Sequence, residues 1–261
     1  MAGFGIAFVL MHSLFFEGAY YLCNIMKFDT YMVHPIRKRS VFFVYLSMFV
    51  FAFSLTSCFD VVEDVSLKSN GSGSIKATVN LSKSKVKVAS LMKLDKVDGM
   101  KVPSKGEIQN EVNDVVKLLR QTPGISNVQH SLDFNNFIGT LSCDFTNVTA
   151  LNTFTKTLST HFKAKVSSYS SYSYDAKTKI FARTSAYSDE AKKGLAKLKP
   201  ENQKSFSDAF FTSIYRFEDN VLKQDNKMGK VSDNKKAVMM RVGVLDLVNG
   251  KVSLSNQISL K

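Results

Sequence analysis

The sequence predicts an α+β protein in which antiparallel sheets are combined with two or three helices. Two observations lead to this class: pairs of segments with alternating apolar and polar residues flank short turns, and two segments between them carry apolar residues at helical spacing. From residue 74 to residue 174 the predicted order is strand, helix, strand, strand, helix, strand. This order is that of the ferredoxin-like βαββαβ unit, which we predict as the central unit, extended by C-terminal strands.

The first predicted hairpin comprises residues 65–69 and 74–81. Both segments alternate apolar and polar residues, and they are joined by the glycine-rich turn Asn70-Gly-Ser-Gly73, which is typical of a tight β-hairpin. The lysine-rich segment that follows, residues 83–94, has no clear period, and we expect at most a short helix there.

A helix is predicted from Ser104. This serine can accept a hydrogen bond from the first helical turn, and Glu107 stands three residues later, as a capping box requires. Apolar residues then follow at helical spacing: Ile108, Val112, Val115, Val116 and Leu119. Pro123-Gly124 predicts the end of the helix.

The next segments complete the central unit. A second hairpin is predicted for residues 125–134 and 137–145, an amphipathic helix for residues 148–162, and a third hairpin for residues 166–174 and 179–184. Together with the first hairpin and the first helix they account for the ferredoxin-like order.

The C-terminal region adds strands. Residues 188–209 are polar and predict a helix interrupted at Pro200, and residues 210–217 predict a strand. After a polar segment, residues 218–236, we expect strands at 237–247 and 251–260 that turn at Asn249-Gly250. These strands either extend the first sheet or build a second one.

A basic and apolar leader precedes this domain. Arg37-Lys38-Arg39 is followed by an apolar stretch, residues 41–55, and then by Thr56-Ser57-Cys58. A short basic segment before about 15 apolar residues is typical of a secretory signal and is slightly short for a membrane-spanning helix.

Leu55-Thr56-Ser57-Cys58 resembles the lipobox of bacterial lipoproteins. The resemblance implies that a diacylglyceryl group is attached to the Cys58 sulfur, that the leader is cleaved before Cys58, and that the new amino terminus receives a further fatty acyl chain such as palmitate. Several acyl chains on one residue give a stable anchor. The rival interpretation is an ordinary transmembrane anchor with a chance cysteine.

These features divide the chain into four parts. We interpret residues 1–31 as an extension upstream of a start codon at Met32, the rival being an N-terminal membrane helix in which Glu17 would be costly. Residues 32–57 are the predicted lipoprotein signal peptide, residues 58–64 a short acidic tether, and residues 65–261 a single α+β domain.

Net charge favours anionic partners. The chain carries 35 basic and 22 acidic residues, of which the leader takes four and two, so the part from Cys58 onward has a net charge of +11. Export from the cytoplasm excludes nucleic acid. Phospholipid headgroups, lipopolysaccharide and other envelope polymers remain as partners, beside the alternative of a merely solvated basic surface.

No group of residues indicates catalysis, a metal or a cofactor. His130 and His161 stand in different predicted elements without ligands at metal-binding spacing. Cys143 has apolar neighbours at alternate positions and is expected to be buried rather than reactive. A carbohydrate-binding role for the Ser-Tyr run at 167–174 is disfavoured, because Tyr169 falls on the opposite strand face from Tyr172 and Tyr174.

Two further resemblances are consistent with a lipoprotein. The residues after Cys58 together with Asn70-Gly-Ser-Gly, Pro123-Gly-Ile-Ser-Asn-Val128 and Phe145-Thr-Asn-Val148 resemble uncharacterised lipoproteins of Bacteroidota-type bacteria. The first hairpin, Tyr215-Arg-Phe217 and Gly250-Lys-Val252 resemble LppM-type lipoproteins, which implies binding of membrane lipids or glycolipids, although a Pro-Gly expected after the Tyr-x-Phe strand is missing.

The leading functional hypothesis is a non-enzymatic envelope lipoprotein, an accessory or scaffold subunit that contacts protein partners through its sheet. The alternative is a binder of anionic lipid or glycolipid that uses a pocket between sheet and helices. Phe59 rather than aspartate follows Cys58, so the enterobacterial signal for inner-membrane retention is missing and we expect the outer membrane.

Overall fold

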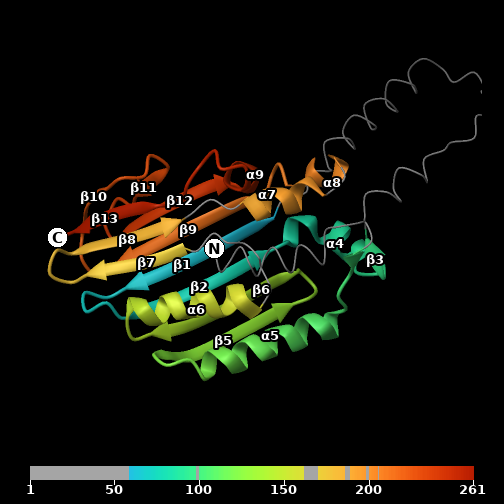
Figure 1. Cartoon of the computed structure of the whole chain (residues 1–261), viewed down its shortest axis with the longest axis horizontal. Helices are drawn as coiled ribbons and strands as arrows, with labels where there is room; N and C mark the ends of the chain where they lie inside the picture. Colours follow the sequence, from blue (N-terminus) through green and yellow to red (C-terminus); the bar gives the residue numbers. More distant parts are fainter. Residues whose placement is uncertain (1–58, 98–99, 162–169, 186–188, 198–199, 205) are drawn as a thin grey trace, which may run out of the picture.

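The computed structural model describes residues 59–97, 100–161, 170–185, 189–197, 200–204 and 206–261 (Figure 1). Residues 1–57 and the predicted lipidation site Cys58 lie outside the described residues, as do residues 166–169 of the third predicted hairpin.

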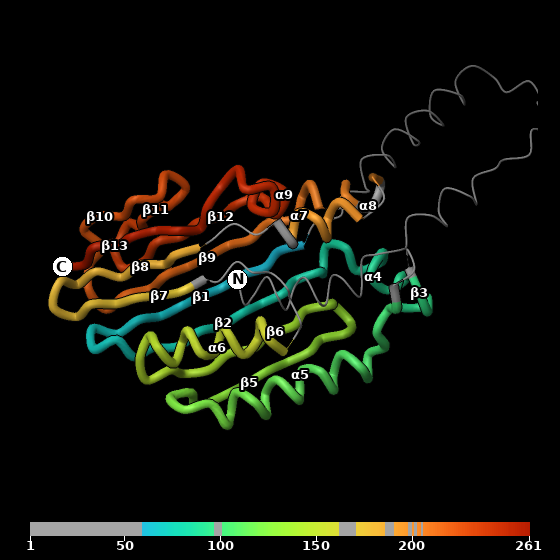
Figure 2. The backbone as a smooth tube through the Cα atoms, viewed as in Figure 1, coloured from blue at the N-terminus to red at the C-terminus, as the bar shows by residue number. Residues whose placement is uncertain are grey.

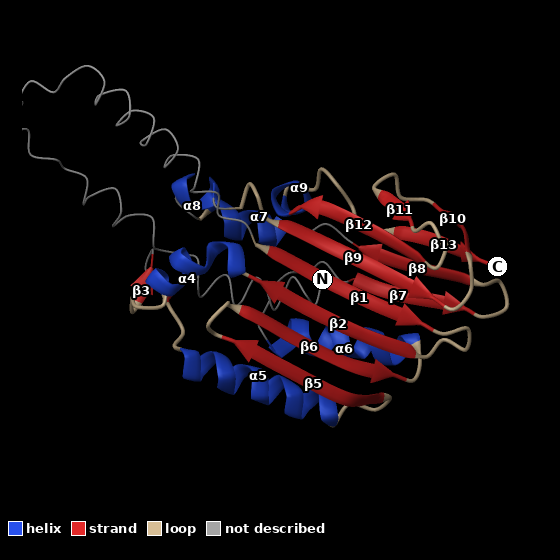
Figure 3. Ribbon diagram, turned by 180° about the vertical axis from the view of Figure 1, so that it is seen from behind, coloured by secondary structure: helices blue, strands red, loops and turns tan. Residues whose placement is uncertain are grey.

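A seven-stranded sheet forms one layer of the molecule, with strand order β11-β12-β9-β1-β2-β6-β5 (Figure 3). All neighbours are antiparallel except β1 and β9, which are parallel and lie side by side although they are far apart in the sequence (Figure 2). Its strands are β1 (Asp60–Leu67), β2 (Gly73–Asn80), β5 (Ile125–Asp133), β6 (Ile138–Phe145), β9 (Phe210–Phe217), β11 (Gly229–Val231) and β12 (Ala237–Gly243).

The second layer covers the inner face of this sheet. It contains a four-stranded sheet of order β10-β13-β8-β7 and, beside it, two helices (Figures 1 and 3). The strands are β7 (Ser170–Asp175), β8 (Ile180–Ser185), β10 (Val221–Gln224) and β13 (Asn256–Leu260), and the helices are α5 (Lys105–Arg120) and α6 (Val148–His161). The predicted α+β class with antiparallel sheets is confirmed.

Shorter elements gather where β1 begins, which we call the anchor end. They include η1 (Ser82–Ser84), α4 (Lys85–Leu91), β3 (Lys96–Val97), β4 (Met100–Lys101), α7 (Asp189–Ala196), α8 (Pro200–Lys204) and α9 (Val244–Val248) (Figure 1). The C-terminus lies at the opposite end of the molecule, which we call the distal end (Figure 1).

The acidic tether predicted for residues 58–64 is wrong, because β1 starts at Asp60. Val61, Glu63 and Val65 point into the core, while Asp60 and Asp64 lie on the outer face of the sheet. Every residue of β1 is paired with β2 on one side and β9 on the other. Alternation of buried and partly exposed positions, rather than overall acidity, determines the structure of this segment.

The ferredoxin-like prediction holds for three of its four strands. The order β2-β6-β5 is the expected one, but the place beside β2 is taken by β1, and β7 belongs to the second sheet. Asn152 of α6 bonds both the N–H and the carbonyl of Tyr172 at 2.8 Å. These bonds occupy backbone groups of β7 that a neighbouring strand would otherwise use.

The predicted hairpin at Asn249-Gly250 is also wrong. Residues 244–248 form α9, in which Val244, Leu247 and Val248 are buried at helical spacing. Gly250, at φ +70°, follows the helix end, and β12 and β13 belong to different sheets. The helical period of the buried residues outweighs the turn signal, because it lets α9 close the core at this end.

Candidate functional site

The first described residues fix the chain at the anchor end. Phe59 is 1% exposed and packs edge-on against Phe206, with ring centroids 5.8 Å apart. Its carbonyl accepts a hydrogen bond from the Phe210 N–H at 3.0 Å. Cys58 is therefore covalently joined to a residue that is already part of the core.

Two cationic side chains lie beside Asp60, the first residue of β1. The Arg241 guanidinium lies 3.1 Å and the Lys83 ammonium 3.5 Å from the Asp60 carboxylate. Lys83 belongs to η1 and Arg241 to the end of β12, so both elements adjoin the start of β1.

The segment from η1 through α4 to Lys96 carries lysines on its outer side. We call its exposed lysines together with Val86 the α4 patch: Lys83, Lys85, Val86, Lys93 and Lys96. Ser90 and Asp95 are also exposed on this segment. Val86 is 81% exposed, more than any other large apolar side chain among the described residues. Val88 and Leu91, both fully buried, hold α4 on the domain.

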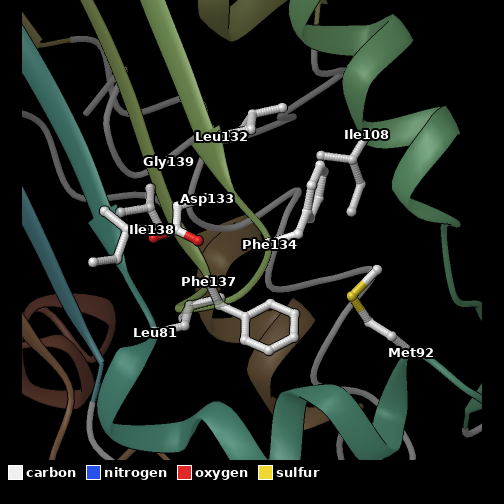
Figure 4. A pocket seen from close by; sticks show the side chains of 10 residues that line it. Leu81, Met92, Ile108, Leu132, Asp133, Phe134, Phe137, Ile138 and Gly139 are labelled. Atoms are coloured by element: carbon white, nitrogen blue, oxygen red, sulfur yellow. The ribbon is translucent and has the colours of Figure 1, made fainter.

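An apolar recess lies beside the α4 patch (Figure 4). Phe134 and Phe137, from the turn between β5 and β6, line it together with Met92 and Ile108. The Lys105 ammonium lies 5.6 Å from the centre of the Phe134 ring. The volume of the recess is about 30 Å³, enough for about two water molecules and far below the size of a site for an organic ligand.

No described helix or strand covers the outer face of the large sheet (Figure 3). We call this surface the open face. Its side chains are mostly short and polar, and come from five strands: Asp60, Val62, Asp64, Ser66, Lys76, Thr78, Asn80, Thr140, Ser142, Asp144, Thr212, Ile214, Arg216, Met239 and Arg241. At its distal end it is hollowed by two adjoining grooves of about 430 and 490 Å³, which share Ser66, Ser74, Asp144 and Arg216. The smaller groove is mainly polar, whereas Leu67, Phe145 and Phe217 also line the larger one.

A buried polar cluster connects the two sheets. The Arg183 guanidinium of β8 donates to Glu63 at 2.8 Å, and to the hydroxyls of Ser213 and Tyr215 at 2.7 Å each. Tyr172 of β7 donates to the same oxygen of Glu63 at 2.7 Å. Glu63 and Arg183 are 0% and 1% exposed.

Charge pairing keeps this cluster ionised. Burial alone would raise the pKa of Glu63, but the Arg183 guanidinium and the Tyr172 hydroxyl hold the pKa below its ordinary value. Burial raises the pKa of Tyr215 to about 12. None of the three hollows described above is lined by residues of this cluster, and its hydrogen bonds link the strands of one sheet to those of the other.

The cysteine and histidines considered for catalysis or metal binding lie apart from one another. Cys143 is 2% exposed, as expected, and burial raises the pKa of its thiol to about 12. His161 lies 2.9 Å from Glu111 on the neighbouring helix, whereas His130 belongs to β5. In the described ranges no three His, Cys, Asp or Glu side chains are placed to hold a metal ion.

The tyrosines of β7 share one face, as predicted, but neither forms an open stacking platform. Tyr172 is buried on Glu63, and Tyr174 donates to the Ser69 carbonyl at 3.1 Å. Tyr169 lies outside the described residues.

Neither the buried cluster around Glu63 and Arg183 nor the burial of Phe59 was predicted from the sequence. The signal for Glu63 was its position in the alternation with Val61 and Val65, which placed it on the inner face. Nothing local indicated Arg183 as its partner, 120 residues away.

Comparison with known proteins gives a weak structural similarity. No family model matches the chain, and no curated protein matches it. Among solved structures, the NMR structure of the folded domain of Mycobacterium tuberculosis LppM is similar, with a TM-score of 0.39 and 14% identity over 78% of this chain and 90% of that chain. LppM is also the type of lipoprotein that the sequence resembles, but a similarity at this level assigns no activity to the present chain.

Within the described residues, no helix has the length and apolar character needed to cross a bilayer.

Proposed function

We propose that this chain is a cell-envelope lipoprotein, anchored through acylated Cys58, that serves as a non-enzymatic accessory or scaffold subunit in the outer membrane. The observation that carries the proposal is the position of Phe59. The described part of the fold begins with this buried residue, which directly follows the cysteine of the lipobox. Cleavage before Cys58 therefore removes the leader and leaves the first core residue in place.

The open face supports the scaffold role. It is broad and polar, and it carries ion pairs such as the one between Arg216 and Asp64, whose atoms approach to 3.0 Å. Interfaces between separately folded subunits are about as polar as the rest of a protein surface. A partner would find hydrogen-bonding side chains on every strand from β12 to β6.

The alternative function, a binder that encloses lipid between sheet and helices, has less support. Of the three hollows described above, the apolar one has only about 30 Å³, and the two larger ones are open grooves at the distal end of the open face rather than a pocket enclosed between sheet and helices. A pocket for a lipid or another organic ligand usually has several hundred Å³.

Intact-mass measurement tests the anchor. Protein extracted from membranes is expected to begin at Cys58 and to carry acyl chains, and the Cys58→Ser variant is expected to lose both the acyl mass and the cleavage. Cys143→Ser is the matched control and is expected to leave acylation unchanged. An unacylated wild-type protein would overturn the proposal.

Photo-crosslinking tests the scaffold role. A photoreactive amino acid at Thr78 or Ser142, on the open face, is expected to capture one stoichiometric envelope protein. The same group at Leu222, which is 66% exposed on β10, is the control and is expected to capture none. Equal yields from all three positions would contradict the proposed surface.

A further inference from the structure

We propose that the anchor end rests directly on the bilayer and that the α4 patch makes a second contact there, with anionic phospholipid headgroups. This inference rests on the proposed acylation of Cys58. It adds to that anchor a fixed orientation of the domain and a lipid-binding surface built from η1, α4 and β3.

The first step is the length of the connection. A single residue adds at most about 3.6 Å of chain, and Phe59 is already held by Phe206 and by the Phe210 N–H. The acyl chains on Cys58 must lie in the hydrocarbon region of the membrane. The residues around Asp60 are thereby kept at the level of the lipid headgroups.

The second step is the nature of the groups held there. Lys83 and Arg241 contact Asp60 itself, so η1 and the end of β12 are at the same level as the anchor. Lys85, Lys93 and Lys96 follow in the α4 patch, and from Ser82 to Lys96 the chain has five lysines and one acidic residue, Asp95. Such a segment is attracted to an anionic membrane surface, with a gain of about fivefold in binding for each lysine near the surface.

The third step is the exposed apolar side chain. Val86 stands between Lys85 and Lys87 and is 81% exposed. On an interfacial segment an apolar side chain enters the boundary between headgroups and acyl chains while lysines remain among the phosphates. The position of Val86 at the anchor end suits this arrangement, and it favours a lipid surface over a soluble anion, which would leave Val86 in water.

A fluorescence experiment on the acylated full chain tests the contact. An environment-sensitive fluorophore is attached to Val86→Cys, and the protein is reconstituted into vesicles of phosphatidylcholine with or without phosphatidylglycerol. Cys143 is buried, with a thiol pKa of about 12, and does not compete for the label. Quenching by brominated acyl chains is expected in the vesicles with phosphatidylglycerol, whereas the same label on Leu222→Cys, at the distal end, is expected to stay unquenched.

Charge reversal identifies the groups responsible. The triple variant Lys85→Glu, Lys93→Glu, Lys96→Glu leaves the two cations on Asp60 in place. It is expected to shift the contact equilibrium by at least about a hundredfold, the product of about fivefold for each lost lysine, and repulsion of the new carboxylates adds to this, so that the label on Val86→Cys is no longer quenched. Lys223→Glu, Lys227→Glu, Lys230→Glu, a triple variant remote from the anchor end, is expected to leave quenching unchanged.

The outcomes separate this inference from the proposed function. An acylated protein whose label on Val86→Cys is unquenched in both kinds of vesicle would overturn the second contact and leave the anchor intact. Equal quenching with and without phosphatidylglycerol would overturn the role of the lysines. A protein without acyl chains by intact mass would overturn the anchor and the inference together.

Discussion

At the scale of single residues, the pairing of Glu63 with Arg183 links the two sheets within the core. The guanidinium reaches across the layer boundary to the carboxylate and to two hydroxyls, all of them buried. A buried ion pair contributes little net stability, but the loss of one partner leaves an uncompensated charge in the core. The pair therefore acts mainly by penalising any other arrangement of the sheets.

Substitution of the arginine tests this. Arg183→Met is expected to lower the free energy of unfolding by about 3–5 kcal/mol, because Glu63 then keeps only Tyr172 among the partners described above. Chemical denaturation measures the loss. Arg216→Met is the matched control. Arg216 forms the same kind of ion pair with Asp64 on the open face, where the arginine side chain is 53% exposed. Its loss is expected to lower the free energy of unfolding by less than about 1 kcal/mol.

The double variant Glu63→Leu, Arg183→Met completes the test. It removes both charges and is expected to be more stable than Arg183→Met alone, since an apolar pair of similar volume costs little in a core. Equal losses in Arg183→Met and Arg216→Met would show that the buried pair has no special role.

At the scale of elements, the sequence correctly predicted those helices, strands and turns that are determined by residues close together in the chain. The capping box from Ser104 to Glu107, the glycine turn at residues 70–73 and the strand at residues 210–217 each lie where the sequence predicted them. The two strands β10 and β11 were missed within a polar segment, because edge strands are short and exposed and carry little apolar pattern.

Other elements depend on distant partners. The parallel pairing of β1 with β9 joins segments more than 100 residues apart. The assignment of β7 to the second sheet depends on the side chain of Asn152, which bonds to the backbone of β7. No local pattern indicates such partners. The position of Phe59 at the anchor end is of the same kind, since its burial requires Phe206 and Phe210.

The capping box of α5 yields a prediction about pH. Hydrogen bonds from the Lys101 ammonium and from the N–H and hydroxyl groups of Ser104 lower the pKa of Glu107 from its ordinary 4.5 to about 2. A lowered folded-state pKa stabilises the protein above pH 4.5, and this stability is lost as the pH falls through about 2. Glu107→Gln keeps a capping side chain but cannot ionise.

Thermal unfolding of the two proteins is expected to show a melting-temperature difference in favour of the wild type that is constant above pH 5 and shrinks as the pH falls from about 4.5 towards 2. Ser104→Ala, which removes the N-cap, is expected to cost about 1 kcal/mol at neutral pH. A melting-temperature difference between wild type and Glu107→Gln that stayed constant down to pH 2 would show that the pKa of Glu107 is not responsible for it.

At the scale of the whole molecule, the direction of β1 relates the anchor to the open face. The strand starts two residues after Cys58, and its eight residues extend roughly 26 Å towards the distal end. Because β1 lies in the middle of the large sheet, the proposed acylation of Cys58 would make the open face extend away from the membrane with β1 at its centre. The short connection to Cys58 thus sets both the height and the direction in which this face is presented.

Insertion of a flexible segment separates anchoring from orientation. A Phe-initiated Gly/Ser segment of about ten residues, placed between Cys58 and Phe59, keeps phenylalanine after the cysteine but lets the domain move over several nanometres. Acylation by intact mass is expected to remain complete, because the lipobox is unchanged. Crosslinking from Thr78 to a membrane-held partner is expected to fall several-fold, since a freely moving domain presents the open face correctly only part of the time. Undiminished crosslinking would mean that the partner binds without help from the anchor, and that the direct connection between Cys58 and the core serves only the contact of the α4 patch with lipid.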